Sequence, residues 1–262
     1  MTNDDGVPVN GRRGGPPGGS TRAAGIVQGL VLALVIVFAA TPLDEWFHDL
    51  VFRYVVSHEV RMVANGMTDL GTTEVAVAIL GGLGAVAYWT ADSGLWRASL
   101  GGLAGLAVGG VGAQLVKHAA CRARPRLVAG WGIGDSGLPD EPDRRGFFHW
   151  PCFARWRYHS FPSGHANTAF TLAVALSAAA PARRGLWLLG AAGVGVSRIV
   201  LNAHFVGDVL AGALVGWWGG LAGLRVVDRW LPGLPRRRRP SDPDSVAEPP
   251  PTGSALTTRD AR

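Results

Sequence analysis

The sequence has 262 residues, of which 48% are hydrophobic and only 17% are charged, so it is long enough for one domain of ordinary size. The apolar residues come in blocks of about twenty with few or no charges, the length that crosses the hydrocarbon core of a bilayer. This pattern excludes an ordinary soluble protein. The net charge of +6 would suit nucleic-acid binding, but many basic residues lie at the ends of apolar blocks, where cytoplasmic loops usually carry them. Membrane orientation therefore explains the charge better, and no nucleic-acid partner is expected.

The apolar blocks predict an all-α, polytopic membrane protein with six transmembrane helices in a bundle. The predicted spans are 23–40, 73–89, 98–116, a segment just after 162–165 that ends near 180, 186–196 and 205–224. Residues 1–22 are rich in Gly and Pro, and residues 231–262 are rich in Pro and Arg. We therefore expect two disordered tails around a membrane domain at 23–230. The first apolar block is long for a signal peptide, so we expect a retained helix.

Two further patterns concern packing. Residues 43–65 place apolar side chains at helical spacing with charged side chains between them, which predicts one amphipathic helix after the first span. This helix either lies on the membrane surface, covers the outer mouth of the bundle, or connects two spans with one buried face. In the third span, Gly101, Gly105 and Gly109 recur every four residues, which predicts close approach of a neighbouring helix.

The positive-inside rule predicts the orientation. With six spans both termini share a side, and that side is cytoplasmic because the N-terminal arginines, Arg97, Arg183, Arg184 and the C-terminal arginines then fall inside. The segment from Lys117 to Arg126 breaks the rule, since its basic residues fall outside. A binding site for an anion explains such an exception. Two other polar segments, 162–165 and 204–208, also fall at outer helix ends, so three segments converge on the extracytoplasmic face.

These three segments predict a phosphate site. A site without metal must neutralise phosphate with fixed cations and hydrogen-bond donors. Lys117, Arg124 and Arg198 are the candidate cations. Ser163 and Gly164 precede a span, so their backbone amides can point at an anion from a helix N-terminus.

Two histidines and a carboxylate complete the chemistry. His204 and Asp208 are four residues apart and share a helix face if the segment is helical. We assign His204 to in-line attack on phosphorus, which gives a phosphohistidine, with Asp208 fixing its tautomer and offsetting its charge. His165 then protonates the leaving oxygen and later activates the water that hydrolyses the intermediate.

The set K-x6-R-P, P-S-G-H and S-R-x5-H-x3-D resembles the three-part signature of the type 2 phosphatidic acid phosphatase and vanadium haloperoxidase superfamily, with every signature position filled. The resemblance spans roughly residues 25–230. It implies an all-helical fold, metal-independent phosphate release and the roles just given. The set of residues to which it assigns those roles is Lys117, Arg124, Ser163, Gly164, His165, Arg198, His204 and Asp208.

The first hypothesis is an integral cell-membrane phosphatase that hydrolyses a lipid phosphate or lipid diphosphate at the outer face. A vanadate-dependent haloperoxidase is the alternative within the superfamily, although its known forms are soluble. A non-enzymatic anion transporter is the third, but its polar residues should line the bundle at several depths. The substrate implied is a membrane lipid, with no obligate protein partner. No metal or other cofactor is expected, because the site histidines are needed for phosphate and no Cys-x2-Cys pair exists.

Cys121 and Cys152 are the only two cysteines, and the predicted topology places both in one outer loop. A disulfide persists outside the cytoplasmic membrane. It would tie the segment from Lys117 to Arg124 to the chain that leads into Ser163. Two separate thiols are the alternative. The remaining polar side chains of this loop either widen the anionic site, contact a lipid headgroup or are only loop charge; they are Arg122, Arg126, Arg155, Arg157, His118 and His159.

Overall fold

The computed structural model describes residues 18–127, 146–153 and 155–231, and its regular structure over these ranges is helical throughout. The predicted all-α fold is therefore confirmed. The helices are α1 (Gly18–Ala40), α2 (Leu43–Tyr54), α3 (His58–Asp69), α4 (Thr73–Thr90), α5 (Ser93–Ala120), α6 (Gly164–Ala179), α7 (Arg184–Val200) and α8 (Val206–Trp230). Short 3-10 turns are η1 (Pro125–Leu127), η2 (Trp156–Tyr158) and η3 (Pro181–Arg183). The two predicted tails lie mostly outside the described residues, and α1 begins within the first of them.

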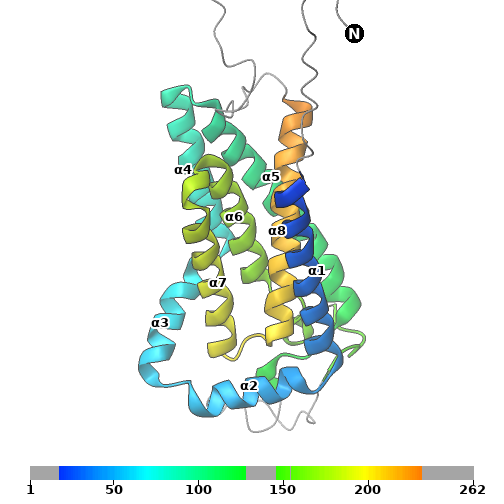
Figure 1. The fold of residues 1–262 in the computed structure, drawn as a ribbon. Helices are drawn as coiled ribbons and strands as arrows, with labels where there is room; N and C mark the ends of the chain where they lie inside the picture. Colours follow the sequence, from blue (N-terminus) through cyan, green and yellow to red (C-terminus); the bar gives the residue numbers. More distant parts are fainter. Residues whose placement is uncertain (1–17, 128–145, 154, 232–262) are drawn as a thin grey trace, which may run out of the picture.

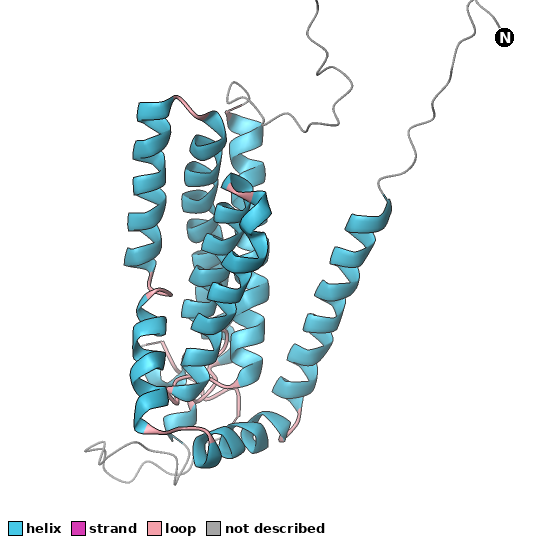
Figure 2. Cartoon of the chain, turned by 60° about the vertical axis from the view of Figure 1, so that its left-hand side comes forward, coloured by secondary structure: helices cyan, strands magenta, loops and turns pink. Residues whose placement is uncertain are grey.

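The long helices run side by side, and α2 lies across one end of them (Figure 1). Helices α1 and α2 meet at a bend of 85°. Helices α6 and α8 begin at the end where α2 lies, which we call the α2 end, and α5 and α7 finish there (Figure 1). Helix α1 begins and α8 finishes at the opposite end, where the first turns of α1 lean away from the other helices (Figure 2).

Three helical segments are long and apolar enough to cross a membrane: Thr73–Thr90, Ser93–Leu127 and Val206–Trp230. The bent pair formed by Gly25–Ala40 and Leu43–Tyr54 makes a fourth if the pair is one span. Helices α6 and α7, with 16 and 17 residues, fall short of the 18 residues that define these spans. The apolar helices support an integral membrane protein, and the six-span topology stays a prediction.

The segment 43–65 forms two helices where the sequence predicted one. Helix α2 ends at Tyr54, and α3 starts after Ser57, whose side chain accepts a hydrogen bond from the Val60 amide at 3.3 Å. A serine at this position supplies the acceptor that an orphan amide in the first turn needs. The amphipathic segment is therefore divided at Ser57 into two helices. This break allows α2 to lie across the end of the bundle while α3 packs alongside α7 (Figure 1).

Helices α5 and α8 pack through glycine, as the four-residue spacing in the third span predicted. A Cβ atom built on Gly105 would lie 2.9 Å from Cα of Gly220 and 3.0 Å from the carbonyl oxygen of Gly219. A Cβ on Gly109 would lie 2.8 Å from the Asn167 side chain of α6. Backbone meets backbone at this seam, so no larger side chain fits without moving a helix. The seam fixes the middle parts of α5 and α8 relative to each other, with α6 packed beside them at Asn167.

We expect Gly105→Ala to lower the melting temperature of the detergent-solubilised protein, because the new methyl group meets backbone that cannot rotate away. Overpacking of this kind costs about 1–3 kcal/mol. Gly112→Ala is the matched control on the same helix, since a Cβ there has nothing within 4 Å. That control should be neutral or slightly stabilising, because alanine favours a helix over glycine by about 0.5–1 kcal/mol. Equal melting temperatures for the two variants would contradict the assignment of the seam.

Candidate functional site

The three predicted segments meet at the α2 end of the bundle. Lys117, in the last turn of α5, donates from Nζ to the carbonyl oxygen of Pro162 at 2.5 Å and to that of His159 at 3.2 Å. The amide of Ser163 donates to the backbone carbonyl of Asp208 at 2.9 Å. Direct hydrogen bonds therefore join the end of α5, the start of α6 and the start of α8. Segments that lie 42 or more positions apart in the chain form one local structure.

The two arginines of the site come from different parts of the bundle. Arg124 follows α5 and lies within 3.5 Å of the carbonyl oxygens of Ala203 and His159. Arg198 is in the last turn of α7 and donates from Nη1 to the hydroxyl of Thr68, on α3, at 2.5 Å. Its Nε is buried and has no hydrogen-bond partner among the described residues. A buried donor without a protein acceptor is the arrangement expected where an anion binds.

His165 lies where the charges of the three cations meet. It is in the first turn of α6, close enough to Arg198, Arg124 and Lys117 to interact electrostatically with each of them. His165 also lines a cavity of about 380 Å³ between α4, α5 and α6, together with Lys117 and Gly164. A half-buried imidazole that faces a cavity can reach a bound group, and the surrounding positive charge favours an anionic one.

The start of α6 presents backbone to the same region. Ser163 is the N-cap of this helix, and its hydroxyl lies 3.5 Å from the amide of Ala166. Gly164 is the first helical residue, and a Cβ built on it would have nothing within 4 Å. The first amides of a helix carry partial positive charge and bind anions readily. The open space at Gly164 gives an anion access to them.

His204 lies in the loop between α7 and α8 and is only 2% exposed. Its Nδ1 lies 2.8 Å from the carbonyl oxygen of Ser160. Because a carbonyl can only accept, Nδ1 carries the hydrogen and Nε2 carries the free lone pair. Burial lowers the pKa of His204 to about 3, although the neighbouring Asp208 carboxylate opposes the change. The imidazole is therefore neutral, and one backbone contact fixes which ring nitrogen carries the free lone pair.

Asp208 is fully buried in the first turn of α8, and three groups donate to its carboxylate. They are Nη1 of Arg122 at 2.6 Å, the hydroxyl of Ser160 at 2.5 Å and the amide of Phe205 at 2.9 Å. The nearest ring nitrogen of His204 is 3.6 Å away, beyond hydrogen-bond length. The sequence analysis gave Asp208 the task of fixing the tautomer of His204. Ser160 takes that role in the structure, and Asp208 acts on His204 through its charge.

Three residues of this arrangement, Ser160, Arg122 and Asp44, had no role or an undecided one in the sequence analysis. Ser160 accepts from the ring of His204 with its carbonyl and donates to Asp208 with its hydroxyl. Arg122 forms a second buried ion pair with Asp44 at 2.9 Å. Position Ser160 precedes the Pro-Ser-Gly-His turn by two residues, which is the only sequence signal that pointed to it. Asp44 is acidic in the first turn of a helix, a pattern too common to indicate a site.

A cluster of positive charge borders the site around Trp156. The guanidinium groups of Arg124, Arg126 and Arg157 lie 5.5, 5.3 and 5.8 Å from the centroid of its ring. Trp156 is half exposed, so this cluster is open to solvent. Stacking on an aromatic face holds guanidinium groups near one another despite their repulsion.

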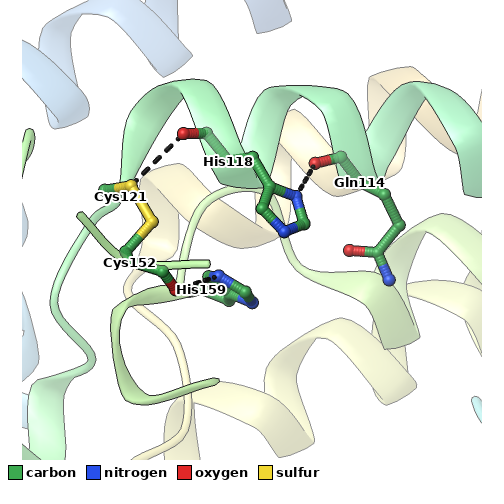
Figure 3. The surroundings of a disulfide bond; sticks show 5 residues. All are labelled: Gln114, His118, Cys121, Cys152 and His159. Carbon is green, nitrogen blue, oxygen red and sulfur yellow. Dashed lines mark hydrogen bonds between the residues drawn. A yellow bond between two sulfur atoms is a disulfide. The ribbon is translucent and has the colours of Figure 1, made fainter. Parts of the chain in front are cut away.

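Cys121 and Cys152 form a disulfide, with their Cα atoms 5.9 Å apart (Figure 3). Cys121 is the C-cap residue that directly follows α5, and Cys152 precedes the turn at Trp156–Tyr158. The rings of His118 and His159 lie beside the disulfide with their centroids 4.7 Å apart (Figure 3). The bridge closes a loop of sequence separation 31 and ties the segment carrying Arg124 to the segment that leads into α6.

Reduction of this disulfide should lower the activity of the protein and its melting temperature. The bridge restrains the backbone carbonyls that hold Lys117 and His204, and loss of a disulfide in a small loop-rich region costs about 2–5 kcal/mol. The measurement compares wild type with and without reductant against the double variant Cys121→Ser/Cys152→Ser. The variant should match reduced wild type and ignore reductant. Full activity in the reduced wild type would contradict this role.

Two comparisons of sequence bear on this site. A family profile described as "PAP2 superfamily" matches residues 99–232. The chain is 30% identical over 109 residues to a lipid A 1-phosphatase of Rhizobium etli, an alignment that covers 42% of this chain and 41% of the relative. A lipid A 1-phosphatase of Rhizobium johnstonii matches with 30% identity over 109 residues, which covers 42% of this chain and 39% of the relative. The match thus spans less than half the length of either curated relative.

Two solved structures share the fold. The PAP2-type phosphatidylglycerolphosphate phosphatase of Bacillus subtilis superposes with a TM-score of 0.55 at 21% identity, covering 80% of this chain and 98% of that protein. LpxE of Aquifex aeolicus superposes with a TM-score of 0.52 at 21% identity, covering 71% of this chain and 98% of that one. The family profile covers the ends of α5, α6, α7 and α8 that carry the candidate site. This chain belongs to the PAP2 superfamily.

Proposed function

We propose that this protein is a metal-independent phosphatase that removes phosphate from a lipid phosphate or lipid diphosphate. One observation carries the proposal: a buried, neutral His204 with its free lone pair on Nε2 lies among the cations Lys117 and Arg124, whose charges reach it. A phosphate ester is attacked by such a nitrogen when fixed positive charge neutralises the phosphate oxygens.

The chemistry runs in two steps. In the first, Nε2 of His204 attacks phosphorus, the N–P bond forms as the P–O bond to the lipid breaks, and the leaving oxygen takes a proton from the imidazolium form of His165, which the negative charge of the bound phosphate favours. In the second, water loses a proton to His165 as its oxygen attacks phosphorus, and the N–P bond breaks to release inorganic phosphate. Lys117, Arg124, Arg198 and the first amides of α6 hold the phosphate through both steps.

Charge placement along the bundle supports six spans with the site on the extracytoplasmic face. Arg97 and Asp228 form an ion pair with an N–O distance of 2.5 Å, which joins the first turn of α5 to the last turn of α8 at the end opposite α2. The turn η3, which connects α6 to α7 and contains Arg183, also lies at that end (Figure 1). The positive-inside rule makes an arginine-rich end cytoplasmic. Helices α6 and α7 then complete the set as short spans of about 24 and 26 Å, at 1.5 Å per residue.

A lipid substrate fits the location of the site. The α2 end of the bundle carries the cations, whereas the long helices between the ends are apolar, so a phosphate headgroup can bind while its chains stay in the bilayer. The names of the relatives suggest the substrates to try first. Lipid A 1-phosphatase and phosphatidylglycerolphosphate phosphatase indicate lipid A and phosphatidylglycerol phosphate. Phosphatidic acid and undecaprenyl diphosphate complete a panel of phosphate monoesters and diphosphates.

The test is inorganic phosphate release by the detergent-purified protein from these four lipids, in the presence of EDTA. Release that survives EDTA supports a metal-independent phosphatase, and the rates identify the preferred lipid. Vanadate should inhibit release, because it adopts the geometry of the phosphate in transfer. No release from any of the four lipids by folded protein would contradict the proposal.

A further inference from the structure

The strongest unexplained feature is a buried cluster of one cation and two carboxylates. The guanidinium of Arg122 lies between Asp44, at 2.9 Å, and Asp208, at 2.6 Å. Its side chain is 4% exposed, and both carboxylates are fully buried. Burying one carboxylate against one arginine would satisfy the usual requirement for charge balance. The second carboxylate is therefore an added cost that needs a reason.

Asp44 is anchored independently of Arg122. It lies in the first turn of α2 and accepts from the amide of Gly207 at 3.1 Å, so it caps the start of α8 from another helix. A Cβ built on Gly207 would lie 2.8 Å from Oδ2 of Asp44, so only glycine allows this approach. The carboxylate is thus held in place even without the ion pair.

Arg122 is also fixed from its two faces. The carbon of its guanidinium lies 4.7 Å from the ring centroid of Phe147 and 4.4 Å from that of Phe205. These rings keep water from the cation, so its interactions with the two carboxylates are weakly screened. Charge changes within this cluster therefore act on its neighbours, and the ring of His204 lies next to Asp208, with Nδ1 3.6 Å from the carboxylate.

The charge count of the cluster explains the second carboxylate. Burial raises the pKa of Asp44 to about 6, so above that pH Asp44 and Asp208 contribute −1 each, Arg122 contributes +1, and the cluster has a net charge of −1. With Arg122 and Asp208 alone, the net charge would be zero and His204 would face a neutralised pair. When Nε2 bonds to phosphorus, the ring becomes cationic because Nδ1 keeps its hydrogen. A cluster with a surplus negative charge stabilises that cation more than a neutral pair does.

We propose that Asp44 is a positioning residue for the nucleophile: it balances the charge of Arg122, so that the charge of Asp208 remains available to the phosphorylated His204 ring. This inference rests on the proposed phosphatase function. If Asp44 has this role, α2 contributes to catalysis although it lies outside the three signature segments. The alternative is a purely structural role, in which Asp44 only holds α2 against α8. The experiment must distinguish this role from the electrostatic one.

The experiment measures the rate of phosphoenzyme formation and kcat for four proteins whose clusters carry three different net charges. Wild type carries −1, Asp44→Asn carries 0, Arg122→Gln carries −2, and the double variant Asp44→Asn/Arg122→Gln again carries −1. Asp49→Asn is the matched control, because Asp49 is also on α2 and pairs at the surface with Arg53. Phosphate release by wild type and its loss in His204→Ala are established first, so failure of the phosphatase proposal is seen separately.

Asp44→Asn should slow phosphoenzyme formation and kcat by at least about tenfold, with KM nearly unchanged, because binding precedes the development of charge on the ring. The double variant should be faster than Asp44→Asn, since its net charge is restored and the amide of Gln can still donate to Asp208. Asp49→Asn should match wild type. A purely structural role of Asp44 predicts the opposite order, in which the double variant is slower than either single variant. In that case the melting temperature of each variant should fall in proportion to its loss of activity.

Two results would overturn the inference. The first is Asp44→Asn with kcat within about twofold of wild type, a change too small for a lost charge near the reacting ring. The second is a folded double variant no faster than Asp44→Asn. If Asp44→Asn does not fold, the double variant decides alone: phosphoenzyme formation above about one tenth of the wild-type rate supports charge balance, and a lower rate rejects it.

Discussion

His204→Ala will lose phosphate release almost completely, by about 10⁴-fold or more, which is the scale seen when a covalent nucleophile is removed. The variant keeps Lys117, Arg124 and Arg198, so it should still bind the lipid. The measurement is release of inorganic phosphate, together with quenching of the wild-type reaction to trap a phosphoenzyme. Phosphate attached through a ring nitrogen should be labile to acid and stable to base, and it should be absent from the variant.

His58→Ala is the control for this loss, because His58 is an exposed histidine at the start of α3. It should release phosphate at the wild-type rate. A phosphoenzyme that persists in His204→Ala, or one with the stability of a serine or aspartyl phosphate, would place the nucleophile elsewhere.

The protonation of His204 gives this prediction a dependence on pH. Its pKa is lowered by burial to about 3, so the free imidazole is neutral and nucleophilic at any pH above about 4. A fall in activity between about pH 7 and pH 5 must then come from another group. In the same range the unfolded chain binds a proton at this residue and the folded chain does not, so stability decreases as the pH falls from about 6.5 towards 3. His204→Gln should remove that part of the acid sensitivity.

The convergence of the three segments was predictable because each candidate residue sits near the end of a predicted helix. Lys117 closes a long apolar block, His165 opens one, and His204 precedes the last. Antiparallel helices joined in this order place those three ends together. The glycine seam was predictable for a similar reason, since a four-residue repeat marks one helix face. These features depend on order and spacing, which the sequence carries directly.

The cluster around Arg122 was not predictable from spacing. Its two ion pairs join residues 78 and 86 positions apart, and Asp44 belongs to a segment outside the signature. In the sequence Arg122 looks like Arg126, its neighbour in the same basic segment, yet one is buried and the other exposed. Only the fold distinguishes them, because Arg122 is buried by two aromatic rings and by α2, a helix far earlier in the sequence. The role of Ser160 was not predictable either, since its contact with His204 is made by a backbone carbonyl, which no side-chain motif encodes.

His165→Gln will separate the two half-reactions. A glutamine keeps the size of the side chain and a hydrogen-bond donor but cannot exchange a proton, so general acid and base catalysis is lost at a cost of about 10²–10⁴-fold. With an alkyl phosphate lipid both steps need His165, and turnover should fall without accumulation of phosphoenzyme. With an aryl phosphate the leaving group needs no proton, so only the second step should be slow.

The decisive measurement is therefore the phosphoenzyme level of His165→Gln with an aryl phosphate such as p-nitrophenyl phosphate. We expect a burst of nitrophenol followed by slow turnover, with phosphate held on His204. His165 is well placed for both proton transfers, because it lines the cavity beside Lys117 and interacts with the same three cations that we propose hold the phosphate. If His165 only bound the anion, the variant would hydrolyse aryl and alkyl phosphates more slowly by the same factor. No phosphoenzyme would then accumulate. That outcome would transfer the acid and base role to another group facing the cavity and leave His165 as part of the phosphate cradle.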